Sequence, residues 1–223
     1  MNPHNGARKY LVTGASGYVG GRLVRAFVDD KEDVRILVRD KNKIMGQPWA
    51  PLVEICEGSA ENFEDLQRAL EGIHTAFYLL HSINLGPHFD EIESEMARNF
   101  ARAAQEAGVS QIIYLGGIAN DVNISKHLAS RAMTGSSLAT TSVAVLELRA
   151  GIVLAAHHQT QQKPRQTRAG SIGAIGLDHR VILAQPPGHG LEQAQRQALM
   201  LFDDIGKGRA RKHQCLDRLD RLD

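Results

Sequence analysis

The chain has 223 residues, of which 43% are hydrophobic and 23% charged, and its formal net charge is +1. This balance is typical of a globular domain and argues against a strongly basic protein that binds nucleic acid or an acidic membrane. Two cysteines, Cys56 and Cys215, are too few for a disulfide framework, and no apolar run reaches the ~20 residues of a membrane span, so we expect a soluble, cytoplasmic protein.

Strand-like and helix-like patterns alternate over the first two thirds of the chain. Compact apolar or β-branched runs predict six strands, at 10–13, 34–38, 52–56, 76–80, 112–115 and within 143–154. Apolar residues at helical spacing predict the helices between them, after residue 18, over 63–70, over 89–107 with a C-cap at Gly108, and over about 124–138. Strands separated by helices imply right-handed crossovers, so we predict an α/β fold with a Rossmann-type, doubly wound parallel sheet.

The character of the sequence changes after about residue 154. Residues 157–165 have no apolar period, and residues 216–223 repeat every three positions, which fits neither a helix face nor a strand face. Val181–Ala184 would form one strand and Leu191–Phe202 one helix. We therefore predict a Rossmann domain over 1–154 and an atypical, weakly structured tail over 155–223. The abrupt change raises the hypothesis that the tail is a truncated or frame-disrupted substrate-binding segment.

A glycine-rich loop between the first strand and the first helix is the strongest functional signal. Its glycines have the spacing GxxGxxG: Gly14 allows a sharp turn, Gly17 a close approach to a pyrophosphate, and Gly20 tight packing of the helix. Free N–H groups at the helix N-terminus then face the anion. A glycine-rich turn without a ligand is the alternative. The flanking strand and helix favour a dinucleotide site formed by Thr13, Gly14, Ala15, Ser16, Gly17, Tyr18, Val19 and Gly20.

The end of the second strand bears on the choice between NADP(H) and NAD(H). A site that prefers NAD(H) usually places a carboxylate there, which binds the ribose 2′-hydroxyl. Here Arg39 comes first, and its guanidinium can pair bidentately with a 2′-phosphate. Asp40 follows and keeps NAD(H) as the alternative, and Arg39 with Lys41 is also compatible with an ordinary solvated turn. We favour NADP(H).

Five short stretches together resemble a known family. They are Thr13–Gly20, Val38–Asp40, Tyr78–Ser82, Ile113–Gly117 and Glu147–Gly151. Over about residues 8–154 the sequence is similar to the atypical short-chain dehydrogenases/reductases, and in particular to the NmrA-like NAD(P)-binding oxidoreductase and epimerase-like group. The resemblance implies that Leu80, His81 and Ser82 lie near the cofactor ribose, and Gly116 and Gly117 near the nicotinamide ribose.

Two residue patterns of the family are missing here. Members often carry an acidic residue near the adenine after the third strand, where this chain has Gly58-Ser59-Ala60. Typical members also use a Tyr and a Lys four residues apart, and none of the four tyrosines has a Lys at that position. His127 and Arg131 have this spacing in the corresponding region and would share a helix face. We predict His127 as acid or base and Arg131 as holder of the ribose or a phosphate; two solvated side chains are the alternative.

Three functions are compatible with these patterns. The first is an NADP(H)-dependent oxidoreductase or epimerase-like enzyme acting on a small molecule. The second is a non-catalytic NAD(P) sensor or scaffold, which the missing Tyr/Lys pair supports. The third is a truncated, inactive fragment, which the unusual tail supports. We favour the enzyme, with no metal, no nucleic acid and no membrane as partner, and we leave its substrate and oligomeric state open.

Overall fold

The computed structural model describes residues 8–81, 89–117, 126–150 and 182–183. The strands within these ranges form one seven-stranded sheet. The strand order is β3-β2-β1-β4-β5-β6-β7. The strands are β1 (Lys9–Thr13), β2 (Asp33–Val38), β3 (Glu54–Glu57), β4 (Thr75–Tyr78), β5 (Gln111–Gly117), β6 (Ala144–Ala150) and β7 (Ile182–Leu183). Strands β1 to β6 are parallel, and β7 runs antiparallel to β6. The predicted doubly wound parallel sheet is confirmed.

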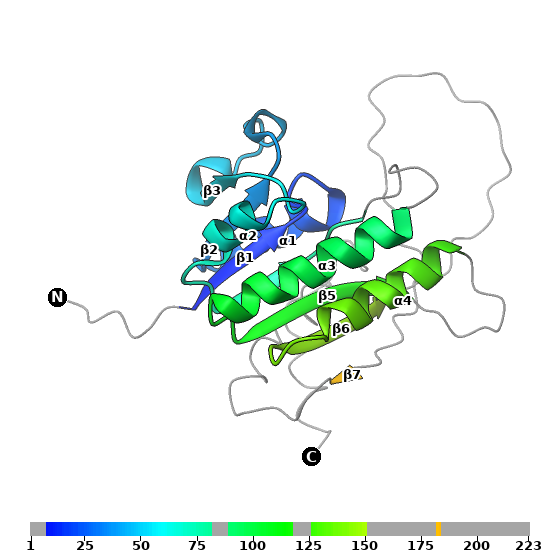
Figure 1. The fold of residues 1–223 in the computed structure, drawn as a ribbon. Helices are drawn as coiled ribbons and strands as arrows, with labels where there is room; N and C mark the ends of the chain where they lie inside the picture. The colour runs from blue at the N-terminus through cyan, green and yellow to red at the C-terminus, as the bar shows by residue number, and fades with distance from the viewer. Residues whose placement is uncertain (1–7, 82–88, 118–125, 151–181, 184–223) are drawn as a thin grey trace, which may run out of the picture.

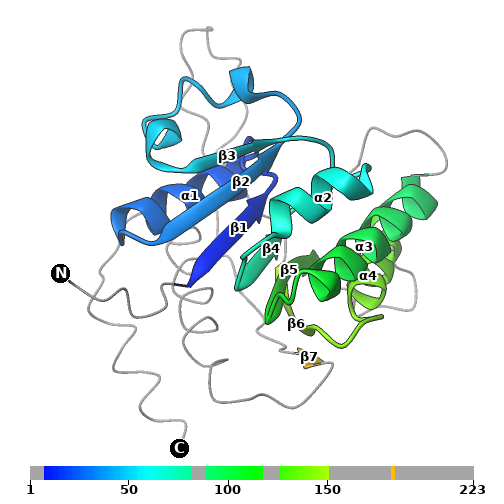
Figure 2. The same cartoon turned by 60° about the vertical axis from the view of Figure 1, so that its left-hand side comes forward.

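Helices cover both faces of this sheet (Figures 1 and 2). The four α-helices of the described ranges are α1 (Tyr18–Asp29), α2 (Phe63–Leu70), α3 (Phe89–Glu106) and α4 (Lys126–Leu138). Helix α1 lies on one face, and α2, α3 and α4 lie on the other (Figure 2). The predicted C-cap is present, because Gly108 has φ +71° and its N–H bonds back to the carbonyl of Gln105. Two 3₁₀ turns that the patterns did not predict, η1 (Lys41–Lys43) and η2 (Ala50–Leu52), connect β2 to β3.

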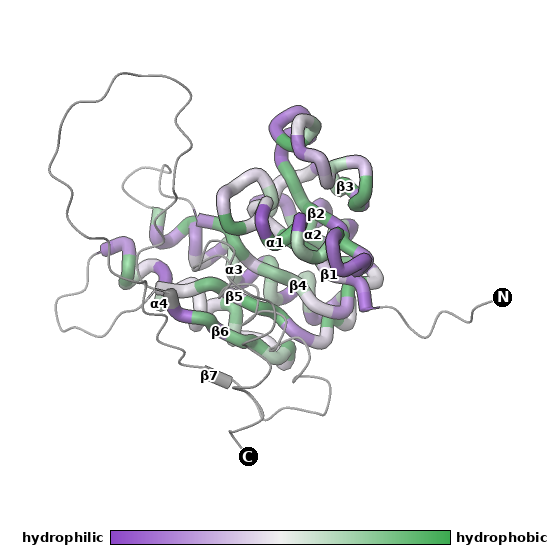
Figure 3. The backbone as a smooth tube through the Cα atoms, turned by 180° about the vertical axis from the view of Figure 1, so that it is seen from behind, coloured by the Kyte–Doolittle hydropathy of each residue, from purple (hydrophilic) through white to green (hydrophobic). Residues whose placement is uncertain are grey.

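Each face of the sheet has its own hydrophobic core. On the α1 side, Tyr10 stacks on Phe27 with the ring centroids 4.6 Å apart. On the α3 side, Tyr78 meets the edge of Phe100 at 5.0 Å. Neighbours on one strand are buried on opposite faces, which explains why the strands are continuously apolar. Figure 3 shows this as hydrophobic colour along β5 and β6.

The side chain of Arg35 fixes β2 and β3 against helix α2. Its Nη1 donates to the carbonyl of Ala69 at 2.9 Å and to that of Glu71 at 2.7 Å, at the C-terminal end of α2. Its Nε donates to a carboxylate oxygen of Glu54 at 2.8 Å. The last carbonyls of a helix have no hydrogen-bond partner within it, so this guanidinium acts as a C-cap and fixes the position of α2 relative to the sheet.

Most of the predicted tail lies outside the described residues. The exception is β7, which falls within the strand predicted at Val181–Ala184; the helix predicted at Leu191–Phe202 is not covered. The division of the chain at 154/155 also falls outside the described ranges and stays a prediction. None of the helices that are described combines the length and the apolar content needed to cross a bilayer.

Candidate functional site

The turn from β1 into α1 brings three glycines into close backbone contact. Gly14 has φ +71°, and a Cβ added to it would lie 2.7 Å from the carbonyl oxygen of Leu79, at the end of β4. A Cβ on Gly20 would overlap the Gly14 carbonyl. Gly17 closes the turn by donating its N–H to Gly14 O at 2.9 Å. The loop therefore requires glycine at positions 14 and 20, while a Cβ on Gly17 would lie 3.2 Å from the Gly14 carbonyl oxygen, a tight contact.

Helix α1 begins without a cap of its own. Its N-cap residue is Gly17, no side chain bonds to the cap, and the first turn carries no acidic residue. Next to it, Thr13 Oγ1 donates to the carbonyl of Phe77 at 2.9 Å and accepts from the N–H of Leu79 at 3.1 Å, which fixes the ends of β1 and β4 together. The uncapped N–H groups and the helix dipole make this turn suited to an anion such as a pyrophosphate.

A cavity of about 340 Å³ opens beside this turn, at the carboxyl ends of β1 to β4. It is lined by Thr13, Gly14, Ser16, Leu37, Val38, Arg39, Gly58, Ser59, Ala60, Glu61, Leu80, His81 and Met96. Six of the predicted cofactor-binding residues are therefore brought together: Thr13, Gly14, Ser16, Arg39, Leu80 and His81.

Other predicted cofactor residues shape the turn without lining this cavity. Ala15 is buried in the core, and Gly17, Val19 and Gly20 form the start of α1. Tyr18 is partly exposed, and the Arg22 guanidinium lies over its ring at 4.4 Å. Ser82 lies outside the described residues.

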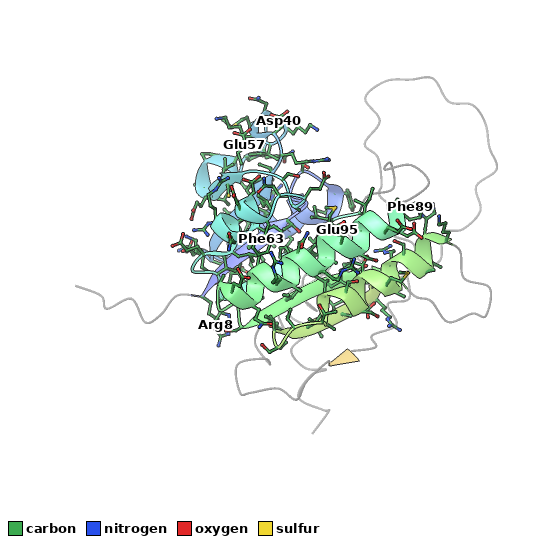
Figure 4. The ribbon with its side chains drawn as sticks, viewed as in Figure 1. Arg8, Asp40, Glu57, Phe63, Phe89 and Glu95 are labelled. Carbon is green, nitrogen blue, oxygen red and sulfur yellow. The ribbon has the colours of Figure 1, made fainter. Side chains whose placement is uncertain are left out.

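The end of β2 presents a cation and not a carboxylate to the cavity. Arg39 lines the cavity and is exposed, and within the described residues it makes no hydrogen bond or ion pair. The carboxylate of Asp40 instead accepts from the N–H of Asn42 at 2.9 Å and caps η1. Lys41 pairs with Glu57 at 3.7 Å. Figure 4 shows Asp40 and Glu57 close together in this region.

Several lining residues were not predicted as part of the site. Ser59, Ala60 and Glu61 follow β3, and parallel topology brings that loop to the same edge as the glycine turn. Residues 58–60 lack the acidic residue that family members often carry there, so this loop has no sequence signal of a cofactor contact. Met96 comes from the apolar stripe of α3, which the pattern presents as core. Its position in the helix carries no signal that its side chain reaches a cavity.

The glycines at the end of β5 make room for two larger side chains. A Cβ on Gly116 would overlap the carboxylate of Glu147, which also packs against Gly135 of α4. A Cβ on Gly117 would lie 3.5 Å from Cδ of Arg131 and closer still to Leu128. Gly116 and Gly117 therefore stand beside the cavity lining and not in it, and they allow α4 to pack close to the sheet.

Arg131 connects the ends of β4 and β5. Its Nη2 donates to the carbonyl of Leu115 at 3.0 Å and lies 3.2 Å from Nε2 of His81. Its backbone carbonyl accepts from the Tyr114 hydroxyl at 3.0 Å. Its Nε is buried and has no partner within the described residues. The structure thus pairs Arg131 with His81, fifty residues away.

His127, the other predicted catalytic residue, lies one turn further out on α4. It is exposed and stacks on Phe89 with ring centroids 4.9 Å apart. Figure 4 shows Phe89 at the start of α3, beyond the end of the sheet. Lys126 lies over the same ring and pairs with Asp90. His127 and Arg131 share a helix but contact different neighbours.

Two buried tyrosines, Tyr78 of β4 and Tyr114 of β5, are poorly suited to proton transfer at neutral pH. Burial raises the pKa of Tyr114 to about 12, and it raises the pKa of Tyr78 further. Both are part of the core beneath α3 and α4. Within the described ranges no group of three or more His, Cys, Asp or Glu side chains could hold a metal ion.

The residues present fit a dinucleotide. Gly14 lines the cavity without a side chain, the α1 N-terminus has no side-chain cap on its N–H groups, and Arg39 supplies a positive charge to the lining. Val38 and Ala60 add apolar surface to the lining. Such a set matches phosphates at the turn, a further phosphate at Arg39 and a base between apolar side chains.

Comparison with known proteins agrees with this geometry. A family model described as NAD(P)H-binding matches residues 14–151. A curated 3-beta-hydroxysteroid dehydrogenase of Mycolicibacterium neoaurum is 31% identical over 116 residues, which make up 48% of this chain and 31% of that protein.

Solved structures share the fold. The Citrobacter sp. triphenylmethane reductase complexed with NADP(H) is 25% identical with a TM-score of 0.54, over 64% of this chain and 49% of that one. A mutant of NmrA, 21% identical, also has a TM-score of 0.54 and covers 66% of this chain and 46% of its own. The matched part therefore spans about a third of the curated relative and about half of these solved chains.

Proposed function

Since the chain belongs to the NAD(P)H-binding family, we propose that it binds NADP(H) in the cavity beside the glycine turn and acts as an oxidoreductase or epimerase-like enzyme on a small molecule. The predicted NAD(P)-binding family is confirmed, and the fold is shared with the triphenylmethane reductase and with NmrA. The cofactor supplies hydride chemistry when bound, and the chain supplies binding, orientation and charge.

The preference for NADP(H) rests on one observation, the different uses of neighbouring residues at the end of β2. Arg39 lines the cavity without a partner among the described residues, while the Asp40 carboxylate caps η1. A free guanidinium favours the 2′-phosphate, and an engaged carboxylate is less available to a ribose 2′-hydroxyl. The 3.7 Å pair with Glu57 leaves Lys41 a weaker candidate than Arg39.

A titration of the full chain with NADPH and with NADH, followed by nicotinamide fluorescence, tests this proposal. We expect NADPH to bind at least about tenfold more tightly, because a charge-assisted hydrogen bond contributes roughly 1.5–3 kcal/mol. Equal affinities would contradict the preference for NADP(H). Binding of neither cofactor would contradict the cofactor site itself.

Catalysis by His127 is tested by His127→Ala, with NADPH oxidation over a panel of small carbonyl compounds as the readout. If His127 transfers the proton, kcat falls by about 100-fold or more while the Kd of NADPH is unchanged, because His127 lies outside the cavity lining. His74→Ala is the matched control, since His74 precedes β4 at the opposite edge of the sheet. Unchanged turnover in His127→Ala removes His127 from the mechanism.

A non-catalytic NAD(P) sensor is the second candidate. The observation that favours it is the burial of Tyr78 and Tyr114. Their raised pKa values make both of them poor proton donors to a substrate. Tight NADPH binding without oxidation of NADPH by any member of the panel supports the sensor. Turnover of any one compound supports the enzyme.

A further inference from the structure

The imidazole of His81 and the guanidinium of Arg131 form a pair that none of the sequence patterns connects. His81 follows β4 and lines the cavity, whereas Arg131 comes from the second turn of α4. Arg131 Nη2 is 3.2 Å from His81 Nε2 and 3.0 Å from the carbonyl of Leu115. A single nitrogen thus holds the ends of β4 and β5 in one arrangement.

The chemistry of the pair determines the proton on the ring. A guanidinium only donates hydrogen bonds, so the nitrogen of His81 that faces it has to accept. A neutral imidazole that accepts at Nε2 carries its proton on Nδ1. His81 then offers a hydrogen-bond donor, and not a second positive charge, from the rim of the cavity.

Arg131 is held firmly enough to impose this state. Its aliphatic stem passes over Gly117, where a Cβ would lie 3.5 Å from Arg131 Cδ. Its backbone carbonyl accepts from Tyr114 at 3.0 Å, which fixes this turn of α4 to β5. Next to it, Ser130 donates to the carboxylate of Glu93 on α3, so the two helices are joined at the same level.

The charges around His81 favour the same neutral state. Burial of the ring is the main cause that lowers the pKa of His81, to about 4, and the positive charge of Arg131 adds to it. The Glu93 carboxylate acts in the opposite direction. His81 is nonetheless exposed at the rim of the cavity, where solvent screens part of the charge of Arg131.

We infer that Arg131 is a positioning residue, which locks His81 as a neutral imidazole with its proton on Nδ1 and so presents a fixed hydrogen-bond donor to an oxygen of the bound cofactor or substrate. The inference deepens the proposed function, on which its ligand rests. In this proposal Arg131 acts through His81, and it does not itself bind a ribose or a phosphate.

Long-range ¹H–¹⁵N correlation spectra of the full chain with ¹⁵N-labelled histidine test the inference without a ligand. The His81 signals are assigned by their loss in His81→Gln. We expect the wild-type ring to stay neutral, with the proton on Nδ1, over about pH 5 to 8. Protonation near the ordinary histidine pKa, or a proton on Nε2, overturns the inference without any variant.

Variants then separate Arg131 from its surroundings. Arg131→Met removes the donor and the charge, so the pKa of His81 moves upward and both tautomers are populated. Arg131→Lys keeps a charged donor and is expected to restore the Nδ1–H form in part. Arg149→Met is the matched control, since Arg149 pairs with Glu147 and not with His81. A His81 ring that keeps its Nδ1–H form in Arg131→Met overturns the role of Arg131.

NADPH is added last, so that a failure of the proposed cofactor site can be distinguished from a failure of the proposed role of Arg131. NADPH is expected to shift the His81 signals and to leave those of His74 in place, because His74 lies at the opposite edge of the sheet. Unshifted His81 signals at saturating NADPH contradict the proposed site. The tautomer of His81 is measured before NADPH is added, so this outcome does not change the conclusion about Arg131.

Discussion

Gly14→Ala is expected to lower both the stability of the chain and its affinity for NADPH. The new Cβ would lie 2.7 Å from the carbonyl oxygen of Leu79, on a residue with φ +71°. The left-handed conformation costs a non-glycine residue about 1–3 kcal/mol, and the forced backbone shift adds about 1–3 kcal/mol. Against a total stability of about 5–15 kcal/mol this is a large loss, visible in urea or thermal unfolding.

The affinity falls because the shift moves the anion-binding turn. Gly14 accepts from Gly17, and the start of α1 packs on its carbonyl through Gly20. Displacing that carbonyl turns the free N–H groups of α1 away from a bound phosphate. Loss of one such hydrogen bond corresponds to at least about a tenfold rise in the Kd of NADPH.

Gly108→Ala is a matched control for the conformational part of this effect. Gly108 has the same φ of +71°, but a Cβ added there meets nothing within 4 Å. It ends α3 at the amino-terminal edge of the sheet, away from the cavity. We expect a loss of about 1 kcal/mol in the free energy of unfolding and an unchanged Kd. Equal behaviour of the two variants would falsify the close approach of Gly14 as the cause.

Arg39→Ala is expected to remove the preference for NADPH. The Kd of NADPH rises by about 10- to 100-fold, because a charge-assisted hydrogen bond worth roughly 1.5–3 kcal/mol is lost. The Kd of NADH stays the same, since NADH carries no 2′-phosphate. The stability also stays the same, because Arg39 is exposed and makes no hydrogen bond or ion pair with any other described residue. Paired titrations with both cofactors measure the ratio directly.

Lys41→Ala is the control for charge alone. Lys41 is two residues away and equally cationic, but its ammonium group is paired with Glu57 at 3.7 Å. Its removal is expected to change the Kd of NADPH by less than about threefold, as for other exposed charges screened by salt. If Arg39→Ala weakened NADH and NADPH equally, or if Lys41→Ala had the larger effect, the assignment of the 2′-phosphate to Arg39 would be wrong.

Local rules predicted most of the fold. Continuous apolar strands such as Ile112–Leu115 and the spaced stripe from Phe89 to Ala107 lie where the patterns place them, because periodicity records which faces are buried. The two 3₁₀ turns between β2 and β3 were missed. They depend on the Asp40 cap and on burial of Trp49, which carry no periodic signal.

The sequence by itself determined the glycine turn and the order of strands and helices. The three glycines of the turn carry that information because the positive φ of Gly14 and the close contacts of Gly17 and Gly20 with Gly14 lie within one strand–turn–helix unit. The position of the cation at the end of β2 was also predictable from the sequence, since Arg39 directly follows the strand.

Only the tertiary structure decided which residues face one another across the sheet edge. The pairing of Arg131 with His81 and not with His127, and the reach of Met96 into the cavity, both depend on how separate elements pack. Spacing along one helix shows which side chains share its face, but the partner of that face is set by strand register and by the small glycines Gly116 and Gly117 that let α4 approach. Contacts between residues fifty positions apart leave no periodic trace in the chain, because they are fixed by packing in three dimensions.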